Sequence, residues 1–215
     1  MKKTLGKGLY AITDCENLAF DSLFDKTGQI LNVGIVALQY RDKSTGSQLR
    51  RKRARTLQAI CKRHRIPFLI NDDIQLALDI QADGVHIGKY DAGLQETRQL
   101  LGQDFIIGVS CYNNIKQAET AQAMGADYIA FGAFYPTTTK QHTVSVMPAL
   151  LSQGKDVLNI PIVAIGGITP ENGAALVEAG ADMLAVISSI YSPAEPAQVI
   201  LQFNKLFQVS SQVHQ

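Results

Sequence analysis

The chain has 215 residues, of which 46% are hydrophobic and 18% are charged, and its formal net charge is +1. This length fits one large domain or two small ones, and the composition is that of a globular protein rather than a disordered chain. A net charge this close to zero gives no general attraction to nucleic acid or acidic membranes. We therefore expect any anion binding to come from locally placed groups.

The cysteines and the apolar segments exclude further classes of protein. Cys15, Cys61 and Cys111 are the three cysteines, and without C-x-x-C spacing they indicate neither a disulfide framework nor a zinc site. The start of the chain lacks the apolar core of a signal peptide, and no apolar run approaches the ~20 residues that span a bilayer. We expect a cytoplasmic protein with no membrane partner.

Short apolar runs rich in β-forming residues alternate along the chain with segments of helical spacing. Helical spacing is clearest at 49–65, 115–125 and 170–180. Strands alternating with helices over about 200 residues predict a parallel (β/α)8 TIM barrel, as a single domain over 1–215 with a polar tail at about 208–215. An open doubly wound sheet is the alternative, but no G-x-G-x-x-G follows the first run. The predicted strands lie at 8–13, 35–40, 67–71, 84–88, 105–110, 128–133, 160–167 and 183–188.

A weak internal repeat supports the barrel. The segments QADGVHIG, MGADYIAFG and AGADMLAVIS each place an aspartate just before a predicted strand. Asp83, Asp127 and Asp182 are therefore expected at equivalent turns on the amino-terminal face of the barrel. Residues on that face serve stability rather than catalysis.

Polar side chains follow the second strand, at the end of the barrel where active sites lie. In the segment QYRDK, Gln39, Arg41 and Lys43 alternate, so they point to the same side of the strand. Arginine offers phosphate a planar fork and lysine offers a compact charge, a pairing that fits an oligophosphate. A solvated strand end is the alternative interpretation.

Carboxylates follow the third and fourth strands. Asp72 and Asp73 come directly after the third strand, and Asp91 comes after the fourth. Neighbouring strands of a barrel lie about 5 Å apart, so one of the adjacent pair can meet Asp91. Two carboxylates near Arg and Lys fit Mg²⁺, with water and phosphate as its other ligands. A general acid and base pair and two helix caps are the alternatives.

The loops after strands six, seven and eight predict phosphate contacts. After strand six, Pro136 fixes a turn before the hydroxyls of Thr137, Thr138 and Thr139 and the charge of Lys140. After strand seven, Gly166 and Gly167 allow close backbone approach, and Thr169-Pro170-Glu171 begins a helix. Loops after strands seven and eight are the usual phosphate site of these barrels.

Three other features have structural interpretations. Residues 49–65 carry eight Lys and Arg, but the stripe of Leu49, Leu57, Ile60 and Cys61 predicts an outer helix rather than a nucleic-acid surface. His86 lies inside a strand and is interpreted as a packed core residue. Cys111 has no histidine nearby in the sequence to activate it.

Taken together and in order over about residues 8–190, the motifs QYRDK, NDD, GVHIG with Asp91, GVSCY, YPTTTK, GGIT and VISS resemble the thiamine phosphate synthase family. The resemblance implies a (β/α)8 enzyme, a transferase that joins hydroxymethylpyrimidine diphosphate to a thiazole phosphate, or its carboxylated form, and releases diphosphate. It also implies Mg²⁺ as cofactor, held by Asp72 and Asp91. The expected binding partners of the protein are then two small-molecule substrates.

The resemblance also implies which residues contact substrate. Catalytic roles fall to Arg41, Lys43, Ser110 and Lys140. Together with Gln39 and Asn71, these four hold the pyrimidine diphosphate. The residues that contact the thiazole phosphate are then Thr137, Thr139, Gly167, Ile187 and Ser188. The substrate-binding set also includes Tyr40, Asp42 and Thr138.

The sequence departs from the family pattern at three positions, and two alternatives remain open. Tyr112 stands where many relatives have His, Lys89 where Gln is frequent and Ala133 where Pro is common. A thiazole tautomerase resembles the synthase but depends on a His at the place of Tyr112. A non-catalytic thiazole phosphate binding or regulatory protein would keep GGIT and VISS but should lose Asp72, Asp91 or Lys140, and all three are present. The outer helices suit either solvent or a second copy, so a homo-oligomer is compatible with the sequence.

Overall fold

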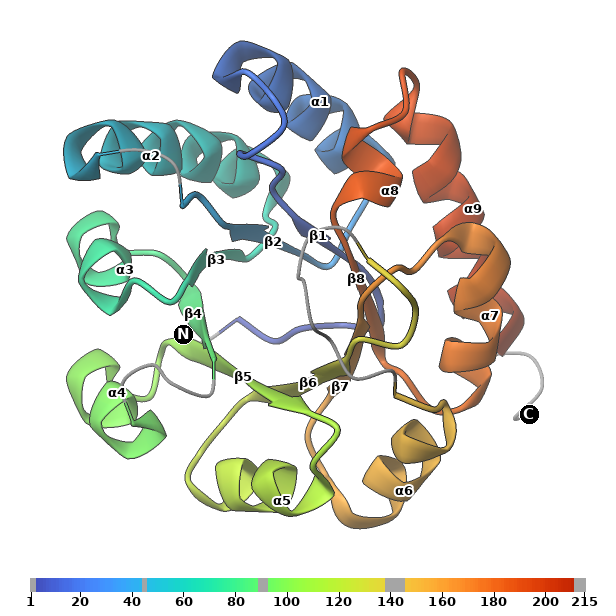
Figure 1. The fold of residues 1–215 in the computed structure, drawn as a ribbon. Coiled ribbons are helices and arrows are strands. Elements are labelled where there is room, and N and C mark those ends of the chain that lie inside the picture. Colours follow the sequence, from blue (N-terminus) through green and yellow to red (C-terminus); the bar gives the residue numbers. More distant parts are fainter. Residues whose placement is uncertain (1–2, 44–45, 89–92, 138–145, 211–215) are drawn as a thin grey trace.

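The strands close into a barrel in chain order. A computed structural model describes residues 3–43, 46–88, 93–137 and 146–210. Each strand pairs in parallel with the next, and β8 pairs with β1 (Figure 1). The predicted (β/α)8 fold is confirmed, and the open doubly wound sheet is wrong. The strands are β1 (Gly8–Ile12), β2 (Ala37–Tyr40), β3 (Phe68–Asn71), β4 (Gly84–Ile87), β5 (Ile106–Tyr112), β6 (Tyr128–Gly132), β7 (Ile162–Ile165) and β8 (Met183–Val186).

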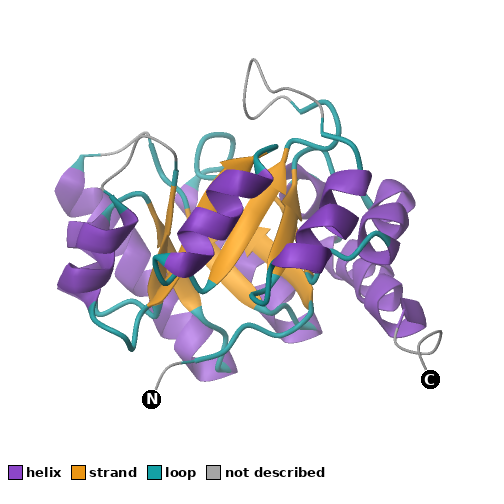
Figure 2. Ribbon diagram, turned by 90° about the horizontal axis from the view of Figure 1, so that it is seen from below, coloured by secondary structure: helices purple, strands orange, loops and turns teal. Residues whose placement is uncertain are grey.

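Helices surround the strands as an outer layer (Figures 1 and 2). Residues 208–210 of the predicted polar tail continue the last helix, and 211–215 lie outside the described residues. None of the helices in the described ranges is long and apolar enough to cross a membrane. The helices are α1 (Phe20–Val33), α2 (Ser47–His64), α3 (Ile74–Ile80), α4 (Leu94–Leu101), α5 (Ile115–Ala123), α6 (Ala149–Val157), α7 (Pro170–Glu178), α8 (Ser188–Tyr191) and α9 (Pro196–Ser210).

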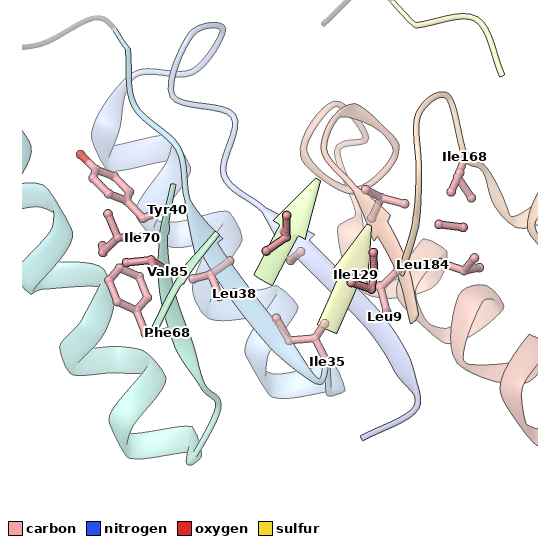
Figure 3. Close-up of a cluster of buried hydrophobic side chains, with 14 of the residues drawn as sticks. Leu9, Ile35, Leu38, Tyr40, Phe68, Ile70, Val85, Ile129, Ile168 and Leu184 are labelled. Carbon is pink, nitrogen blue, oxygen red and sulfur yellow. The ribbon is translucent and has the colours of Figure 1, made fainter. Parts of the chain in front are cut away.

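The hydrophobic core has two layers because successive residues of a strand point to opposite faces. In β1, Leu9 and Ala11 pack outward against the helices, whereas Tyr10 and Ile12 point into the barrel. Figure 3 shows part of the outer layer, where side chains such as Leu38 and Leu184 fill the space outside the strands. The inner layer includes Leu69, Ile106, Val163 and Met183, all nearly fully buried. The interior of the barrel toward the amino-terminal ends of the strands is therefore filled rather than open.

The basic helix α2 packs as an outer barrel helix, as predicted. Leu57, Ile60 and Cys61 are buried against the barrel together with Ala54. Leu49 was expected in this stripe, but it is 47% exposed because it lies in the first turn of α2, beyond the packed face. Several of the basic side chains form ion pairs with carboxylates of neighbouring segments: Arg50 with Asp73, Arg51 with Asp79, and Arg53 with Asp42.

The three repeated aspartates perform one structural task at the amino-terminal end of the barrel. Each carboxylate accepts a hydrogen bond from a backbone N–H near the start of the preceding strand: Asp83 from Phe68 at 2.8 Å, Asp127 from Ile107 at 2.8 Å, and Asp182 from Ile162 at 2.9 Å. Because each aspartate lies just before the next strand, the bond ties two consecutive strands together. The predicted stabilising role of these residues agrees with this geometry.

Candidate active site

A cavity of about 290 Å³ lies at the carboxyl ends of the strands. Every strand contributes at least one side chain to its wall, so the cavity is centred on the barrel axis. Apolar side chains pack the interior toward the amino-terminal ends of the strands. The cavity therefore lies at the end where barrels of this type carry their active sites. The contributing strand residues include Ile12, Gln39, Asn71, His86, Ser110, Ala130, Val163 and Ala185.

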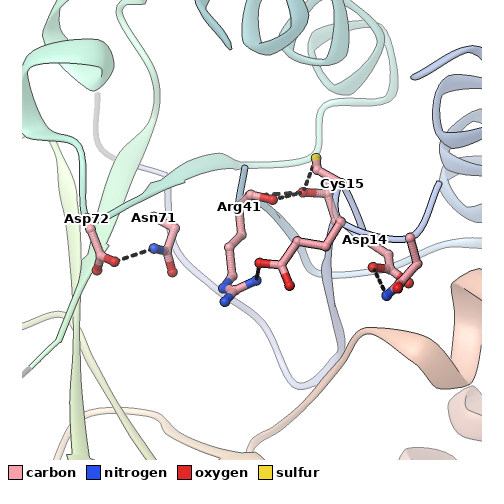
Figure 4. Close-up of polar contacts among 8 residues, drawn as sticks. Asp14, Cys15, Arg41, Asn71 and Asp72 are labelled. Carbon is pink, nitrogen blue, oxygen red and sulfur yellow. Dashed lines mark hydrogen bonds and ion pairs between the residues drawn. The ribbon is translucent and has the colours of Figure 1, made fainter. Parts of the chain in front are cut away.

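The alternation predicted after β2 holds in the structure. Gln39, Arg41 and Lys43 all line the cavity. The Nη1 atom of Arg41 lies 2.7 Å from Oε1 of Glu16, and the Thr13 hydroxyl accepts a 2.9 Å bond from the Arg41 backbone N–H (Figure 4). The guanidinium is thus held at the cavity wall by a carboxylate that is itself 40% exposed. An incoming anion would compete with Glu16 for this guanidinium.

Tyr40 and Asp42 do not reach the cavity with their side chains. The Tyr40 hydroxyl donates a 2.8 Å hydrogen bond to Asp42, and Arg53 of α2 lies 3.3 Å from the same carboxylate oxygen. The Asp42 side chain is fully buried in this cluster. Because these residues alternate with Gln39, Arg41 and Lys43, they face the outer helix layer. The structure therefore places these two side chains away from the cavity, and a substrate contact of either residue stays a prediction.

The adjacent carboxylates Asp72 and Asp73 point in different directions. Asp72 has a φ of 62°, in the left-handed region, and lines the cavity. The Asn71 amide donates a 2.6 Å bond to its carboxylate (Figure 4). Asp73 instead caps α3, accepting a 2.9 Å bond from the Leu76 N–H, and pairs with Arg50 at 2.8 Å. Asp73 is therefore a helix cap, the interpretation that the sequence left open for these carboxylates.

The loops after β7 and β8 meet at one side of the cavity. Gly167, Ile187, Ser188 and Thr137 all line it. Gly167 has a φ of 62°, and a Cβ there would collide with the Pro136 carbonyl oxygen. Glycine is therefore required for this close approach. The predicted helix start is confirmed, because α7 begins at Pro170.

Some predicted residues lie outside the described part of the chain. They are Lys89, Asp91, Thr138, Thr139 and Lys140. In the described ranges, no group of three or more His, Cys, Asp and Glu side chains is arranged to hold a metal ion. The roles assigned to Asp91 and Lys140 therefore stay predictions.

His86 is a buried residue of β4 that also reaches the cavity wall. Its ring is only 9% exposed, yet it lines the cavity rather than the helix-facing core. Its Nδ1 lies 2.9 Å from the Tyr128 hydroxyl and its Nε2 lies 2.8 Å from the Ser110 hydroxyl. Strand parity was the available signal, because His86 pairs in register with the cavity residue Asn71. The interpretation of His86 as a packed residue agrees with this burial and with its stacking on the Tyr128 ring, and the structure adds that it also lines the cavity.

The cysteines are buried and unsuited to nucleophilic chemistry. Burial raises the pKa of Cys15, Cys61 and Cys111 to about 12, from an ordinary 9.0. The thiolate, which is the reactive form, is therefore scarce at neutral pH. None of the three lines the cavity, in agreement with the sequence analysis of Cys111.

The closed barrel and its open cavity, lined by both polar and apolar side chains, define a (β/α)8 protein that binds small molecules at the carboxyl ends of its strands. Residues 9–190 match the family described as thiamine monophosphate synthase. The thiamine-phosphate synthase of Thioalkalivibrio sulfidiphilus is 42% identical over 203 residues, covering 94% of this chain and 96% of the relative. That of Xylella fastidiosa is 46% identical over 203 residues, covering 94% and 86%. The chain belongs to the thiamine monophosphate synthase family.

A solved structure gives the same family by a separate route. Thiamine phosphate pyrophosphorylase from Pyrococcus furiosus superposes with a TM-score of 0.83 at 26% sequence identity, covering 94% of this chain and 96% of that one. The agreement extends over the whole barrel rather than one motif.

Proposed function

We propose that the chain is a thiamine phosphate synthase, a transferase of thiamine biosynthesis that joins a pyrimidine diphosphate to a thiazole phosphate. The support is its family, together with relatives named thiamine-phosphate synthase at 41–46% identity. The observation that carries the proposal is one cavity shared by the cations after β2, the carboxylate after β3 and the glycine loop after β7. Such a cavity suits two phosphorylated substrates that must meet.

The two substrates are assigned to opposite sides of the cavity. The pyrimidine diphosphate is proposed to contact Gln39, Arg41, Lys43, Asn71 and Ser110, with Lys140 as a further contact. The presence of the first five on the cavity wall supports this assignment. The thiazole phosphate is proposed to bind near Thr137, Thr139, Gly167, Ile187 and Ser188.

Mg²⁺ is proposed to bind Asp72, with Asp91 as second carboxylate. Asp72 fits this role because its carboxylate lines the cavity while Asp73 is engaged as a helix cap. Hard cations of this size prefer carboxylate oxygens and complete their shell with water and phosphate. When bound, the ion would neutralise charge on the leaving diphosphate.

The proposed reaction needs no protein nucleophile. The bond between the pyrimidine methylene and the diphosphate oxygen breaks, and its electron pair leaves with the diphosphate. The thiazole nitrogen then gives its lone pair to the methylene carbon, so atoms and charge balance without a proton transfer. Arg41 and Lys43 stabilise the negative charge that develops on the leaving group. The walls of the cavity align the two rings.

The experiment mixes purified protein with Mg²⁺ and both substrates and measures products by chromatography. We expect thiamine phosphate and diphosphate in equal amounts. A folded protein that binds thiazole phosphate without turnover would refute the synthase and favour a binding protein. Isomerisation of the thiazole carboxylate phosphate without the pyrimidine substrate would favour a tautomerase, although Tyr112 occupies the place of the histidine which that enzyme needs.

A further inference from the structure

Residues 3–7 run across the amino-terminal end of the barrel. Figure 1 shows the segment crossing from beside β4 to the start of β1. The Lys3 ammonium lies 2.9 Å from Oδ1 of Asp83, just before β4, and the Lys7 ammonium lies 3.7 Å from Oδ1 of Asp182, just before β8. Because β4 and β8 are on opposite sides of the closed barrel, the two contacts span it. We call residues 3–7 the cross-barrel strap.

The middle of the cross-barrel strap packs against the interior of the barrel. Leu5 is half-buried and contacts the inner apolar layer, as Val36 does. Its neighbours Thr4 and Gly6 are exposed, so the segment turns one large apolar side chain toward the barrel and its polar side chains toward solvent or ion-pair partners. Leu5 therefore covers the inner layer at the amino-terminal ends of the strands.

Gly8 connects the cross-barrel strap to β1. Its φ is 149°, a conformation that residues with a side chain rarely adopt. A Cβ at this position would lie 2.7 Å from Cγ1 of Val36. The Gly8 N–H donates a 3.0 Å hydrogen bond to the carbonyl oxygen of Asp182. Glycine thus lets the chain pass from the strap into β1 while it stays bonded to the β8 side.

The pairing of β1 with β8 differs from the other pairings of the barrel. Consecutive strands are joined by a short connection through a helix, whereas β1 and β8 are the first and last strands. The entropy lost when two strands pair grows with the length of chain between them, so this pairing is the most costly to close. We call it the seam; in it, Gly8 pairs with Met183 and Tyr10 with Ala185.

We propose that the cross-barrel strap is a latch that keeps β1 paired with β8, so that the barrel opens locally at the seam when the strap is released. Leu5 and the Gly8 bond supply most of the strength, because Lys7 is 72% exposed and exposed ion pairs contribute little. Lys3 anchors the strap on the far side of the barrel. The proposal does not rest on the proposed function.

The seam matters to the cavity because both of its strands line it. Tyr10 and Ile12 of β1, and Ala185 and Val186 of β8, are part of the cavity wall. An opening between these strands separates two neighbouring parts of that wall and admits water between them. A contact at the amino-terminal end of the barrel thereby maintains the shape of the cavity at the carboxyl end.

The test measures native-state hydrogen exchange of backbone amides by NMR on the full chain. We expect Leu5→Ala to accelerate exchange in β1 and β8 about tenfold. Amides of β5 and β6, away from both anchors, should change by less than about twofold. Thr4→Ala is the matched control, because Thr4 is the exposed neighbour of Leu5, and it should leave all four strands unchanged. Equal acceleration in all four strands, or none in β1 and β8, overturns the proposal.

Two further variants keep the test decisive. If Leu5→Ala does not fold, Leu5→Val makes a smaller change at the same site, and β1 and β8 should still exchange faster than β5 and β6 relative to wild type. Lys3→Met removes the charge that pairs with Asp83 and keeps a long side chain. We expect it to accelerate exchange at the seam about twofold, although Asp83 lies on the far side of the barrel. Acceleration confined to β4 would contradict the role of Lys3 as an anchor for the seam.

Discussion

The two ends of the barrel use the same side chain, aspartate, in opposite ways. At the amino-terminal end, Asp83, Asp127 and Asp182 each accept a backbone hydrogen bond, and each also lies in an ion pair. At the carboxyl end, Asp72 faces the cavity from a left-handed backbone, with the Asn71 amide beside it. The aspartates at the amino-terminal end thus hold strands together, whereas the aspartate at the carboxyl end is positioned to meet a ligand.

The number of hydrogen bonds that a carboxylate accepts from within the fold separates the two roles better than its burial or residue type. Asp182 satisfies backbone and lysine donors from within the fold, so its removal leaves the buried N–H of Ile162 unpaired. Arg41 instead pairs with the side chain of Glu16, and Asp72 accepts a hydrogen bond from the amide of the cavity residue Asn71. We expect that these bonds can be exchanged for bonds to an anion or a cation without unfolding.

The largest expected effect comes from Asp72→Asn, which removes the charge and keeps a residue type that tolerates a positive φ. We expect kcat/KM to fall roughly a hundredfold or more, about 2.7 kcal/mol of transition-state stabilisation. The free energy of unfolding should stay within about 0.5 kcal/mol of wild type. Steady-state kinetics and urea unfolding measure the two. A large loss of stability with full activity would place Asp72 with the structural aspartates.

Asp182→Ala tests the other end of the barrel. The N–H of Ile162 and the ammonium of Lys155 lose their acceptor, so we expect the free energy of unfolding to fall by about 2 kcal/mol. Because the cavity lies at the opposite end, kcat of the folded enzyme should not change. Lys155→Ala is the control, since it removes the ion pair and keeps the backbone bond. A drop in kcat at equal folded concentration would contradict a purely stabilising role for Asp182.

Asp73→Ala sharpens the comparison within one dipeptide. The substitution removes the cap of α3 and the ion pair with Arg50. We therefore expect the free energy of unfolding to fall by about 1 kcal/mol. Catalysis should stay within about twofold of wild type, the range of a surface substitution. Asp73→Asn is the matched control, because asparagine caps equally well. Loss of Mg²⁺-dependent turnover in both variants would move the metal role to Asp73.

The smallest expected effect concerns the three thiols, which take part in neither role. Burial raises the pKa of Cys15, Cys61 and Cys111 from 9.0 to about 12, so a thiol reagent should not label the native protein at pH 8. The neutral thiols favour the folded state fully below pH 9, and this contribution is lost as pH rises toward 12. Labelling with and without denaturant measures the first part. Rapid native labelling of any of the three would contradict their burial.

Much of the fold was predictable because hydrophobic alternation and turn residues act locally. The spacing of the apolar runs predicted each of the strands from β1 to β8, and the alternation of Gln39, Arg41 and Lys43 predicted a shared face. The same alternation excludes Tyr40 and Asp42 from the cavity. Their assignment to substrate came from motif membership and ignored strand parity.

The remainder of the site depends on contacts between distant segments. Glu16 meets Arg41 across two loops, and His86 finds its partners on β5 and β6. No local pattern in the sequence encodes which interior side chains of different strands will lie at the same height. These contacts therefore became visible only once the barrel was closed.

The account is tested most directly by a crystal structure of the protein with Mg²⁺ and inorganic diphosphate. It predicts an ion at the carboxyl end bound to Asp72, with the diphosphate in contact with Arg41 and the Ser110 hydroxyl, and Asp73 still on the first turn of α3. An ion held directly by Asp73, or a diphosphate bound away from the cavity, would contradict it.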